Sequence, residues 1–181
     1  MSQIVIVSGP SGAGKSSVCE AMCERYDRTV HIETDEFFAA IRMGRINPMH
    51  KESDRQNRMV TRAAARAATA FAQELFAVFI DGVIGPHLLP IYLEELKPAG
   101  VAVQFVLLMP PAEITLARVA PRPSDRQMIE REHRELHRQF SEHGAFAGYT
   151  IDNSDLTAQQ TADLVMEACG RGDCLVCSPE A

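Results

Sequence analysis

The sequence lacks the features that mark membrane-spanning, secreted and repetitive proteins. It contains no uninterrupted apolar run long enough to cross a bilayer, no internal repeat and no low-complexity segment. The pattern at its amino terminus indicates a core strand, so we expect no signal peptide there. These absences favour a globular protein of the cytoplasm that has no membrane partner.

Positive charge is also scarce. The 181 residues include 18 Lys and Arg against 24 Asp and Glu, which gives a formal net charge of −6. Proteins dedicated to nucleic acid usually carry an excess of basic residues, so nucleic acid is not the expected partner. The length and a hydrophobic fraction of 46% fit one domain with a substantial core. The sequence does not distinguish a monomer from a dimer.

Cysteine is present, but without the spacing of a zinc site. Cys19 and Cys23 lie four residues apart in a predicted helix, and Cys174 and Cys177 form a C-x-x-C near the C-terminus. A second C-x-x-C, or a Cys/His pair at zinc spacing, is missing. Buried cysteine commonly behaves as a small hydrophobic residue. We therefore expect no metal or redox function from the cysteines.

The strongest signal is the glycine-rich segment 9–16, G-P-S-G-A-G-K-S, which matches G-x-x-x-x-G-K-[ST] at every fixed position. An apolar run over residues 3–8 predicts a buried strand before it, and a segment without breakers predicts a helix after it. This order directs backbone N–H groups and a helix N-terminus at one anion. The chain is therefore predicted to bind ATP, together with Mg²⁺.

The predicted nucleotide site comprises the loop and the first residues of the following helix. The glycines let the backbone approach phosphate oxygens closely, and Lys15 brings a mobile positive charge to the β- and γ-phosphates. The Ser16 hydroxyl is a candidate ligand of Mg²⁺. The residues of this site are Gly9, Pro10, Ser11, Gly12, Ala13, Gly14, Lys15, Ser16 and Ser17.

Apolar runs alternate with helical patterns along the chain. We predict strands near residues 3–8, 29–33, 76–81, 101–108 and 149–151, with helices that include 54–76, 124–143 and 157–169. This alternation predicts an α/β fold whose mainly parallel sheet is covered by helices on both faces. The helix 54–76 is expected to bury a face made of Val60, Ala64, Ala67, Phe71 and Leu75. Residues 170–181 are expected to form an irregular tail.

Two aspartates follow predicted strands at the rim that carries the glycine-rich loop. Asp35 comes just after the second strand, where a carboxylate could take the proton of an acceptor hydroxyl. The alternative role of Asp35 is to cap the helix that follows. Asp81 ends the third strand, which suits a second Mg²⁺ carboxylate, although a turn aspartate before Gly82 is the alternative. We predict Asp35 as the catalytic base and Asp81 as a metal ligand.

Arginines gather after the fourth predicted strand. Arg118, Arg122 and Arg126 bracket the two prolines at 121 and 123, a pattern that suits a lid over the phosphates but also solvated surface charge. We predict a lid at about 118–126, with Arg118 and Arg122 in catalysis. A second group of arginines lies on one stripe of the helix 54–76 and is predicted to be a solvated face. It consists of Arg55, Arg58, Arg62 and Arg66.

Four segments of the chain resemble the small P-loop kinases of the nucleoside-monophosphate-kinase-like fold, and most closely the chloramphenicol phosphotransferase-like proteins. They are residues 9–17, 31–38, 78–84 and 149–152. The resemblance implies a three-layer P-loop NTPase fold with a five-stranded parallel sheet in the order 2-3-1-4-5. It also implies that Asp35 is the general base and that Arg118 and Arg122 belong to the lid.

The same resemblance implies a kinase-like domain over residues 1–169, with an acceptor region at about 36–58. Within it, residues 44–58 do not look like a chloramphenicol site, so the acceptor stays open; Arg42, Arg45, Asn47 and His50 are candidates for reading it. The favoured function is transfer of the γ-phosphate of ATP to a hydroxyl of a small molecule. The alternatives are a nucleoside, nucleotide or polynucleotide-end kinase, and a switch or adaptor that hydrolyses ATP without a small acceptor.

Overall fold

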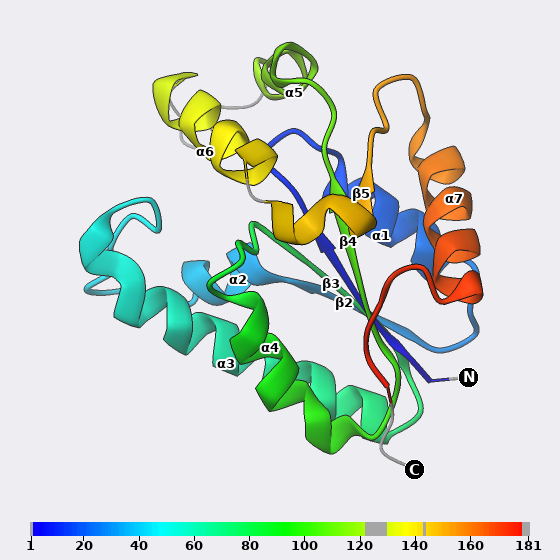
Figure 1. Ribbon diagram of the computed structural model, residues 1–181. Helices are drawn as coiled ribbons and strands as arrows, with labels where there is room; N and C mark the ends of the chain where they lie inside the picture. The colour runs from blue at the N-terminus through cyan, green and yellow to red at the C-terminus, as the bar shows by residue number, and fades with distance from the viewer. Residues whose placement is uncertain (1, 122–129, 143, 179–181) are drawn as a thin grey trace.

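A twisted sheet lies between two groups of helices in the computed structural model (Figure 1). The structure describes residues 2–121, 130–142 and 144–178. Its parallel strands are β1 (Ile4–Ser8), β2 (Thr29–Glu33), β3 (Ala77–Gly82), β4 (Val103–Leu108) and β5 (Thr150–Ile151). They are arranged in the order β2-β3-β1-β4-β5, which confirms the predicted parallel sheet and its 2-3-1-4-5 order.

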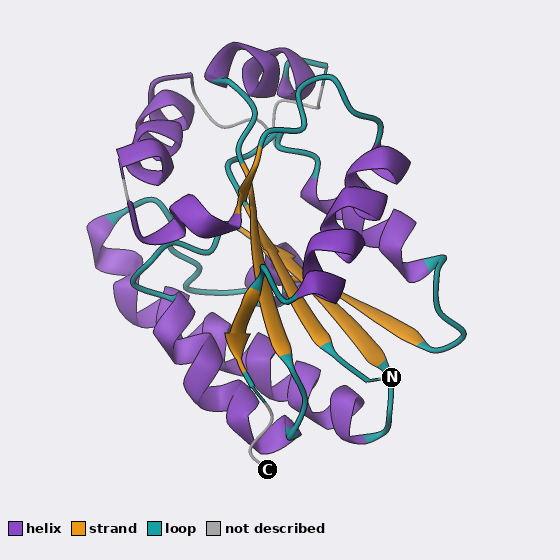
Figure 2. Ribbon diagram, turned by 45° about the vertical axis from the view of Figure 1, so that its right-hand side comes forward, coloured by secondary structure: helices purple, strands orange, loops and turns teal. Residues whose placement is uncertain are grey.

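The three central strands are buried along their whole length because helices cover both faces of the sheet (Figure 2). One face packs against α3 (Asp54–Gln73) and α4 (Leu89–Leu96), and the other against α1 (Lys15–Cys23) and α7 (Ala158–Arg171). Continuous apolar strands are what a sheet covered on both sides requires. This explains why the strand pattern in the sequence lacks the alternation of a half-exposed sheet.

The remaining elements connect these layers. The short helix α2 (Thr34–Ala39) follows β2, and α5 (Ala112–Val119) and α6 (Glu130–Glu142) come between β4 and β5. Three 3₁₀ helices complete the described chain: Lys51–Ser53, Lys97–Ala99 and Gly144–Tyr149. The predicted helix 124–143 agrees with α6 where the chain is described, and its first residues lie outside that part. No helix among the described residues is long and apolar enough to cross a membrane.

The C-terminal segment is more ordered than predicted. Helix α7 continues to Arg171, and Gly172 ends it in the left-handed conformation with φ 81°. The next residues form β6 (Leu175–Cys177), which pairs antiparallel with β4. The expectation of an irregular tail from residue 170 is therefore wrong for this part, because β6 finds backbone partners along the edge of β4 that β5 leaves open.

The buried face of α3 also differs from the prediction. Val60 and Ala64 are buried as expected, but Phe71 is 41% exposed and Leu75 is 70% exposed. The remaining buried positions are small: Thr61, Ala65, Ala68 and Ala72. Alanines allow the close approach of α3 to α4, and Leu75 leaves the helix in the left-handed conformation with φ 64°. The larger side chains predicted for the core therefore point outward at the end of the helix.

Candidate functional site

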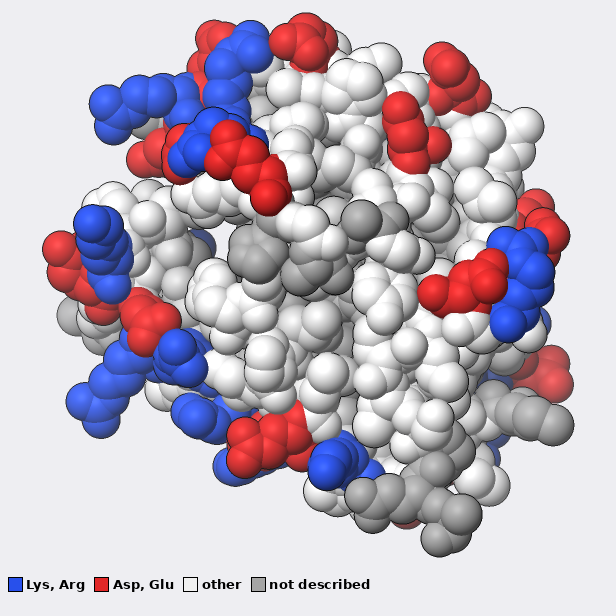
Figure 3. Space-filling view, viewed as in Figure 1, with Lys and Arg blue, Asp and Glu red and all other residues white. Residues whose placement is uncertain are grey.

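A cleft of about 1480 Å³ lies at the carboxyl ends of the parallel strands, where ligands bind in sheets of this type. Its walls come from the glycine-rich loop, α2, the segment before α3, the β3–α4 connection and α6. In Figure 3 a hollow opens between the side chains of α6 and those at the start of α3, with charges of both signs along its rim. The cleft brings together Lys15, Ser16, Asp35 and Asp81.

The glycine-rich loop is closely packed from behind. Gly9 has φ 148°, and a Cβ atom there would lie 2.3 Å from the carbonyl oxygen of Leu108. Gly12 has φ 82°, and its Cβ atom would lie 2.3 Å from the carbonyl oxygen of Thr115. Both the backbone conformation and the space therefore require glycine at these two positions.

Helix α1 begins directly after this loop in a form that suits an anion. Gly14 is its N-cap, with no side-chain cap hydrogen bond, and the first turn contains no acidic residue. In any α-helix the first N–H groups point out of the N-terminus, where a phosphate group can accept from them. The Lys15 ammonium donates to the Pro10 carbonyl oxygen at 3.1 Å and lies over the same loop. This arrangement fits a triphosphate.

Buried polar side chains hold the loop from two sides. Asn153, which is 3% exposed, follows β5 and donates from Nδ2 to the carbonyl oxygen of Ala13 at 3.0 Å. Ser8, at the end of β1, donates to the carbonyl oxygen of Ile84 and accepts from its N–H, each at 3.0 Å. The loop is thus fixed to β5 on one side, while Ser8 fixes the β3–α4 connection on the other.

Asp81 lies at the end of β3 and is 5% exposed. His31 Nε2 lies 2.9 Å from Asp81 Oδ2, because neighbouring strands β2 and β3 carry the two residues on one face. Burial lowers the pKa of His31, but the hydrogen bond and charge of Asp81 outweigh burial and raise that pKa overall. His31, which was expected to be structural, contacts the carboxylate predicted to bind Mg²⁺. Its place in a strand offered no signal of this contact.

Asp35 is exposed in the first turn of α2 and lines the cleft. The N-cap of α2 is Glu33, and no side chain caps the helix. The alternative role of Asp35 as a helix cap is therefore wrong, and its carboxylate is not engaged as a cap. Glu33 also lines the cleft, and burial and then the charge of Asp81 raise its pKa. Glu33 was not predicted as a site residue, because it lies within the second strand.

Arg118 lies on α5, beside the loop that follows β5. Its Nη2 donates to the carbonyl oxygens of Asn153 at 3.2 Å and Ser154 at 3.1 Å. It does not line the cleft, so its predicted role in a lid remains a prediction. Arg122 and Arg126 lie outside the described residues.

Two histidines attach helix α6 to α5 and to the segment just before it. Thr115 Oγ1 donates to the Ala112 carbonyl oxygen at 2.9 Å, so it accepts from His133 Nε2 at 2.8 Å. His137 Nε2 donates to the Pro110 carbonyl oxygen at 2.9 Å. Burial, His137, Arg134 and Lys15 lower the pKa of His133, which is 0% exposed. The charged sequence of this helix gave no sign that His133 is buried.

The candidate acceptor region is held by the start of α3. Gln56 exchanges two hydrogen bonds with the backbone of Ile46, at 2.9 and 2.8 Å, and Asn57 Nδ2 donates to the carbonyl oxygen of Pro48 at 2.9 Å. Of the four predicted acceptor residues, three line the cleft: Arg45, Asn47 and His50. Arg42 does not line it. His87, expected to be structural, is exposed and lines the cleft.

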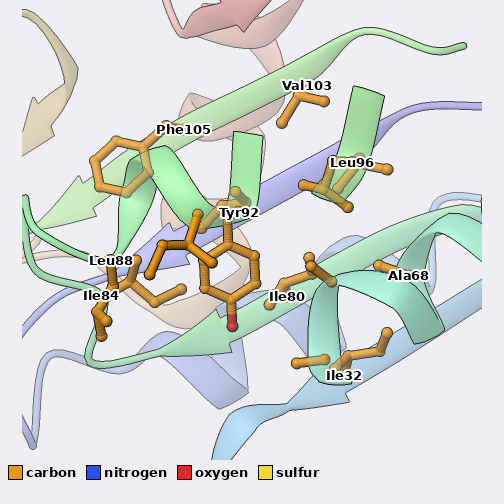
Figure 4. Packing of buried hydrophobic residues seen from close by; sticks show 14 of the residues in the cluster. Ile32, Ala68, Ile80, Ile84, Leu88, Tyr92, Leu96, Val103 and Phe105 are labelled. Carbon is orange, nitrogen blue, oxygen red and sulfur yellow. The ribbon is translucent and has the colours of Figure 1, made fainter. Parts of the chain in front are cut away.

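Apolar side chains form part of the wall of the cleft. Tyr92 of α4 is 1% exposed and lies against the sheet beside Leu88 and Ile80, with its hydroxyl at the end far from α4 (Figure 4). Burial and then the charge of Asp81 raise the pKa of its phenol. Other large apolar residues that line the cleft include Phe38, Met49, Val60, Ile84, Leu88, Leu136 and Phe140.

The arginines of α3 lie away from the cleft. Arg62 and Arg66 both form ion pairs with Glu95 of α4, and Arg58 pairs with Asp54 one turn earlier. The arginine side chains in these pairs are 42 to 69% exposed. They behave as the solvated face that the sequence predicts, with contributions to stability that are small for exposed pairs.

A protein-family model described as an AAA domain matches residues 4–146. No curated protein matches the chain. Among solved structures, the tunicamycin resistance protein of Deinococcus radiodurans superposes with a TM-score of 0.69 at 21% identity, covering 99% of this chain and 100% of that chain.

Two kinases have similar structures. A sugar kinase from Janibacter superposes with a TM-score of 0.69 at 18% identity, covering 94% of this chain and 95% of that chain. The shikimate kinase of Acinetobacter baumannii gives a TM-score of 0.57 at 22% identity, covering 95% of this chain and 94% of that chain. These likenesses show a shared P-loop kinase-like fold.

Proposed function

The chain belongs to the AAA domain family and has a P-loop kinase-like fold; from this premise we propose that it is an ATP-dependent kinase of a small-molecule alcohol. The γ-phosphoryl group of ATP is transferred to a hydroxyl of the acceptor. The proposal rests above all on one observation, that a phosphate-binding loop and a free-standing carboxylate, Asp35, line the same cleft.

In this proposal the loop and α1 hold the donor. The backbone N–H groups of residues 12–16 and the Lys15 ammonium bind the β- and γ-phosphates, where they offset the negative charge that shifts during transfer. The glycine conformations and the packing behind the loop hold these N–H groups in place for the phosphates. Arg118 and Arg122 are proposed to add positive charge from the lid.

Asp35 is proposed to act on the acceptor. Its carboxylate takes the proton of the attacking hydroxyl while the oxygen of that hydroxyl bonds to the γ-phosphorus. The bond between the γ-phosphorus and the β–γ bridging oxygen breaks, and ADP leaves with that oxygen. The acceptor itself lies in the region of Arg45, Asn47 and His50, against the apolar wall of the cleft.

Ser16 and Asp81 are the residues that would hold Mg²⁺. Both supply oxygen ligands, which this cation prefers, and both line the cleft beside the loop. The His31 hydrogen bond occupies one carboxylate oxygen of Asp81 and sets its orientation. When bound, Mg²⁺ neutralises part of the charge on the phosphates.

Measurement of ATP consumption with and without a panel of metabolite alcohols tests this function. A kinase of a small molecule consumes ATP only when its acceptor is present and yields a phosphorylated product, detected by mass spectrometry. The Asp35→Asn variant serves as the control for transfer. Steady hydrolysis of ATP that no member of the panel stimulates would instead indicate a switch or adaptor, and stimulation by nucleotides or polynucleotide ends would indicate the other class of kinase.

A further inference from the structure

Three side chains with different donor atoms converge under helix α1. They are the Cys19 thiol, the His31 imidazole and the Asp81 carboxylate, and their donor atoms all lie within 4.8 Å of one another. Each comes from a different element, since α1, β2 and β3 supply one residue each. The geometry points to a site for a borderline transition-metal cation, Zn²⁺ above all, and we propose that the protein binds Zn²⁺ there.

The donor set favours Zn²⁺ over the Mg²⁺ used in phosphoryl transfer. Mg²⁺ takes oxygen ligands in octahedral geometry, whereas one sulfur, one nitrogen and one oxygen suit Zn²⁺, which bonds to all three. Zinc sites with three protein ligands keep a fourth position open to water or another ligand. Cys19, His31 and Asp81 are therefore enough protein ligands for a Zn²⁺ site whose fourth position is open.

The distances require only small movements. Tetrahedral Zn²⁺ places its donor atoms roughly 3.4–3.6 Å apart, as its bond lengths of about 2.0–2.3 Å dictate. His31 Nε2 and Asp81 Oδ2, now 2.9 Å apart, would separate slightly, and the sulfur would approach from within 4.8 Å. Rotation of these side chains about their χ angles supplies such shifts without a change in the sheet.

The negative charge at this point suits a cation, and the ligands are held inside the protein. Cys19 is 0% exposed and Asp81 is 5% exposed. The Asp81 carboxylate lies 2.9 Å from His31, and Glu33 lies two residues after His31 on the same strand. A cation at this point is attracted by these carboxylates. The Cys19 thiol loses its proton to solvent as the sulfur binds.

Access is available from the cleft, because Asp81 lines it and the His31 side chain is 16% exposed. A Zn²⁺ ion at this position would take the carboxylate that we propose for Mg²⁺. Zn²⁺ would then inhibit phosphoryl transfer. This inhibition rests on the proposed function, whereas the binding of Zn²⁺ does not. Cysteine spacing gives no sign of this arrangement, because its three residues are distant in the sequence.

The test is competition for Zn²⁺ between the full chain and a chromophoric chelator, without nucleotide or Mg²⁺. We expect one Zn²⁺ per chain, bound at least tenfold more weakly by Cys19→Ala and by His31→Gln. The matched controls are Cys23→Ala, one turn along the same helix, and Cys177→Ala in β6, and both should bind within twofold of the parent. Thermal melts of each variant verify that it is folded.

Co²⁺ gives an independent measure, since its thiolate charge-transfer band should appear in the parent and disappear in Cys19→Ala. His31→Gln retains a donor for Asp81, so it keeps the test valid if Cys19→Ala does not fold. Equal affinity in the parent and either site variant would overturn the proposal, as would loss of binding in Cys177→Ala. Because ATP binding is measured separately, failure of the zinc site and failure of the kinase assignment are distinguishable.

Discussion

The two walls of the cleft differ in how firmly they are fixed. One wall is the glycine-rich loop, which we call the donor wall after its proposed role. There Gly9 and Gly12 have no room for a Cβ atom, and the buried side chains of Ser8 and Asn153 hold the adjoining backbone. The other wall includes the loop before α3, which we call the acceptor wall after its proposed role. There Gly44 has open space around it and Met43 is 90% exposed. Two of the hydrogen bonds that hold this loop, those between Gln56 and Ile46, are exposed to solvent.

This contrast explains how strongly the structure of each wall restricts its sequence. A wall built from close packing tolerates few sequences, so its motif identifies the ligand class. A wall built from an exposed loop tolerates many, and loops of this kind carry specificity. The glycine-rich motif therefore indicates the class of the proposed phosphate donor. The proposed acceptor depends on an exposed loop, whose sequence can change with little effect on the stability of the fold.

The largest expected effect concerns the carboxylate between the two walls. Asp35→Asn should lower turnover by about 10²–10⁴-fold and leave ATP affinity nearly unchanged, because the amide keeps the size but cannot take a proton. Steady-state kinetics and calorimetry with Mg·ATP measure the two quantities. Asp54→Asn, an exposed carboxylate elsewhere in the cleft, should change turnover by less than about threefold. Full activity in Asp35→Asn would move the role of base to Asp81.

Because the two walls differ in packing, replacing a glycine by alanine should lower the free energy of unfolding more on the donor wall than on the acceptor wall. Gly12→Ala should lower the free energy of unfolding by about 2–5 kcal/mol, the sum of left-handed strain and a clash with the Thr115 carbonyl oxygen. Gly44→Ala meets only the strain, at φ 75°, and should cost about 1–2 kcal/mol. Urea denaturation compares them. Equal losses would show that the loop is not packed as described.

A smaller loss of stability is expected when a polar contact is removed from either wall, and the loss should be greater on the donor wall. Asn153→Ala removes the hydrogen bond to Ala13 and leaves a buried carbonyl oxygen unpaired, which should cost about 1–3 kcal/mol of stability and weaken ATP binding. Gln56→Ala breaks exposed bonds that water replaces, so it should cost less than about 1 kcal/mol and leave ATP binding unchanged. The account fails here if Gln56→Ala weakens ATP binding as much as Asn153→Ala.

The smallest effect is a pH dependence on the donor side. His133 has a folded pKa below its ordinary value, so the unfolded chain binds its proton more readily. The stability from neutral His133 is complete above about pH 6.5 and is lost as pH falls towards the folded pKa. His133→Gln keeps an N–H donor for Thr115 and should flatten this acid decline in urea melts. The exposed His50→Gln should not alter it, and equal slopes in all three proteins would refute the burial of a neutral imidazole.

The sequence predicted the parallel sheet and the glycine-rich loop because each depends on local pattern: apolar runs, turn glycines and one eight-residue motif. The strand order was implied only by the resemblance to small P-loop kinases. Prediction from the sequence failed where long-range packing decides. Phe71 and Leu75 continue the apolar stripe of α3, yet the helix turns its alanines inward to approach α4. His31 and Asp81 lie 50 residues apart, so only the pairing of β2 with β3 reveals their contact.

The central claim, that the glycine-rich loop is the donor site, is tested most directly by calorimetry of Mg·ATP binding to the parent and to Lys15→Ala. Loss of a charge-assisted contact with the phosphates should weaken binding by about 1.5–3 kcal/mol, roughly 10- to 150-fold. Lys51→Ala, an exposed lysine on the acceptor side of the same cleft, should bind within twofold of the parent. Binding by Lys15→Ala as tight as that of the parent would contradict the assignment.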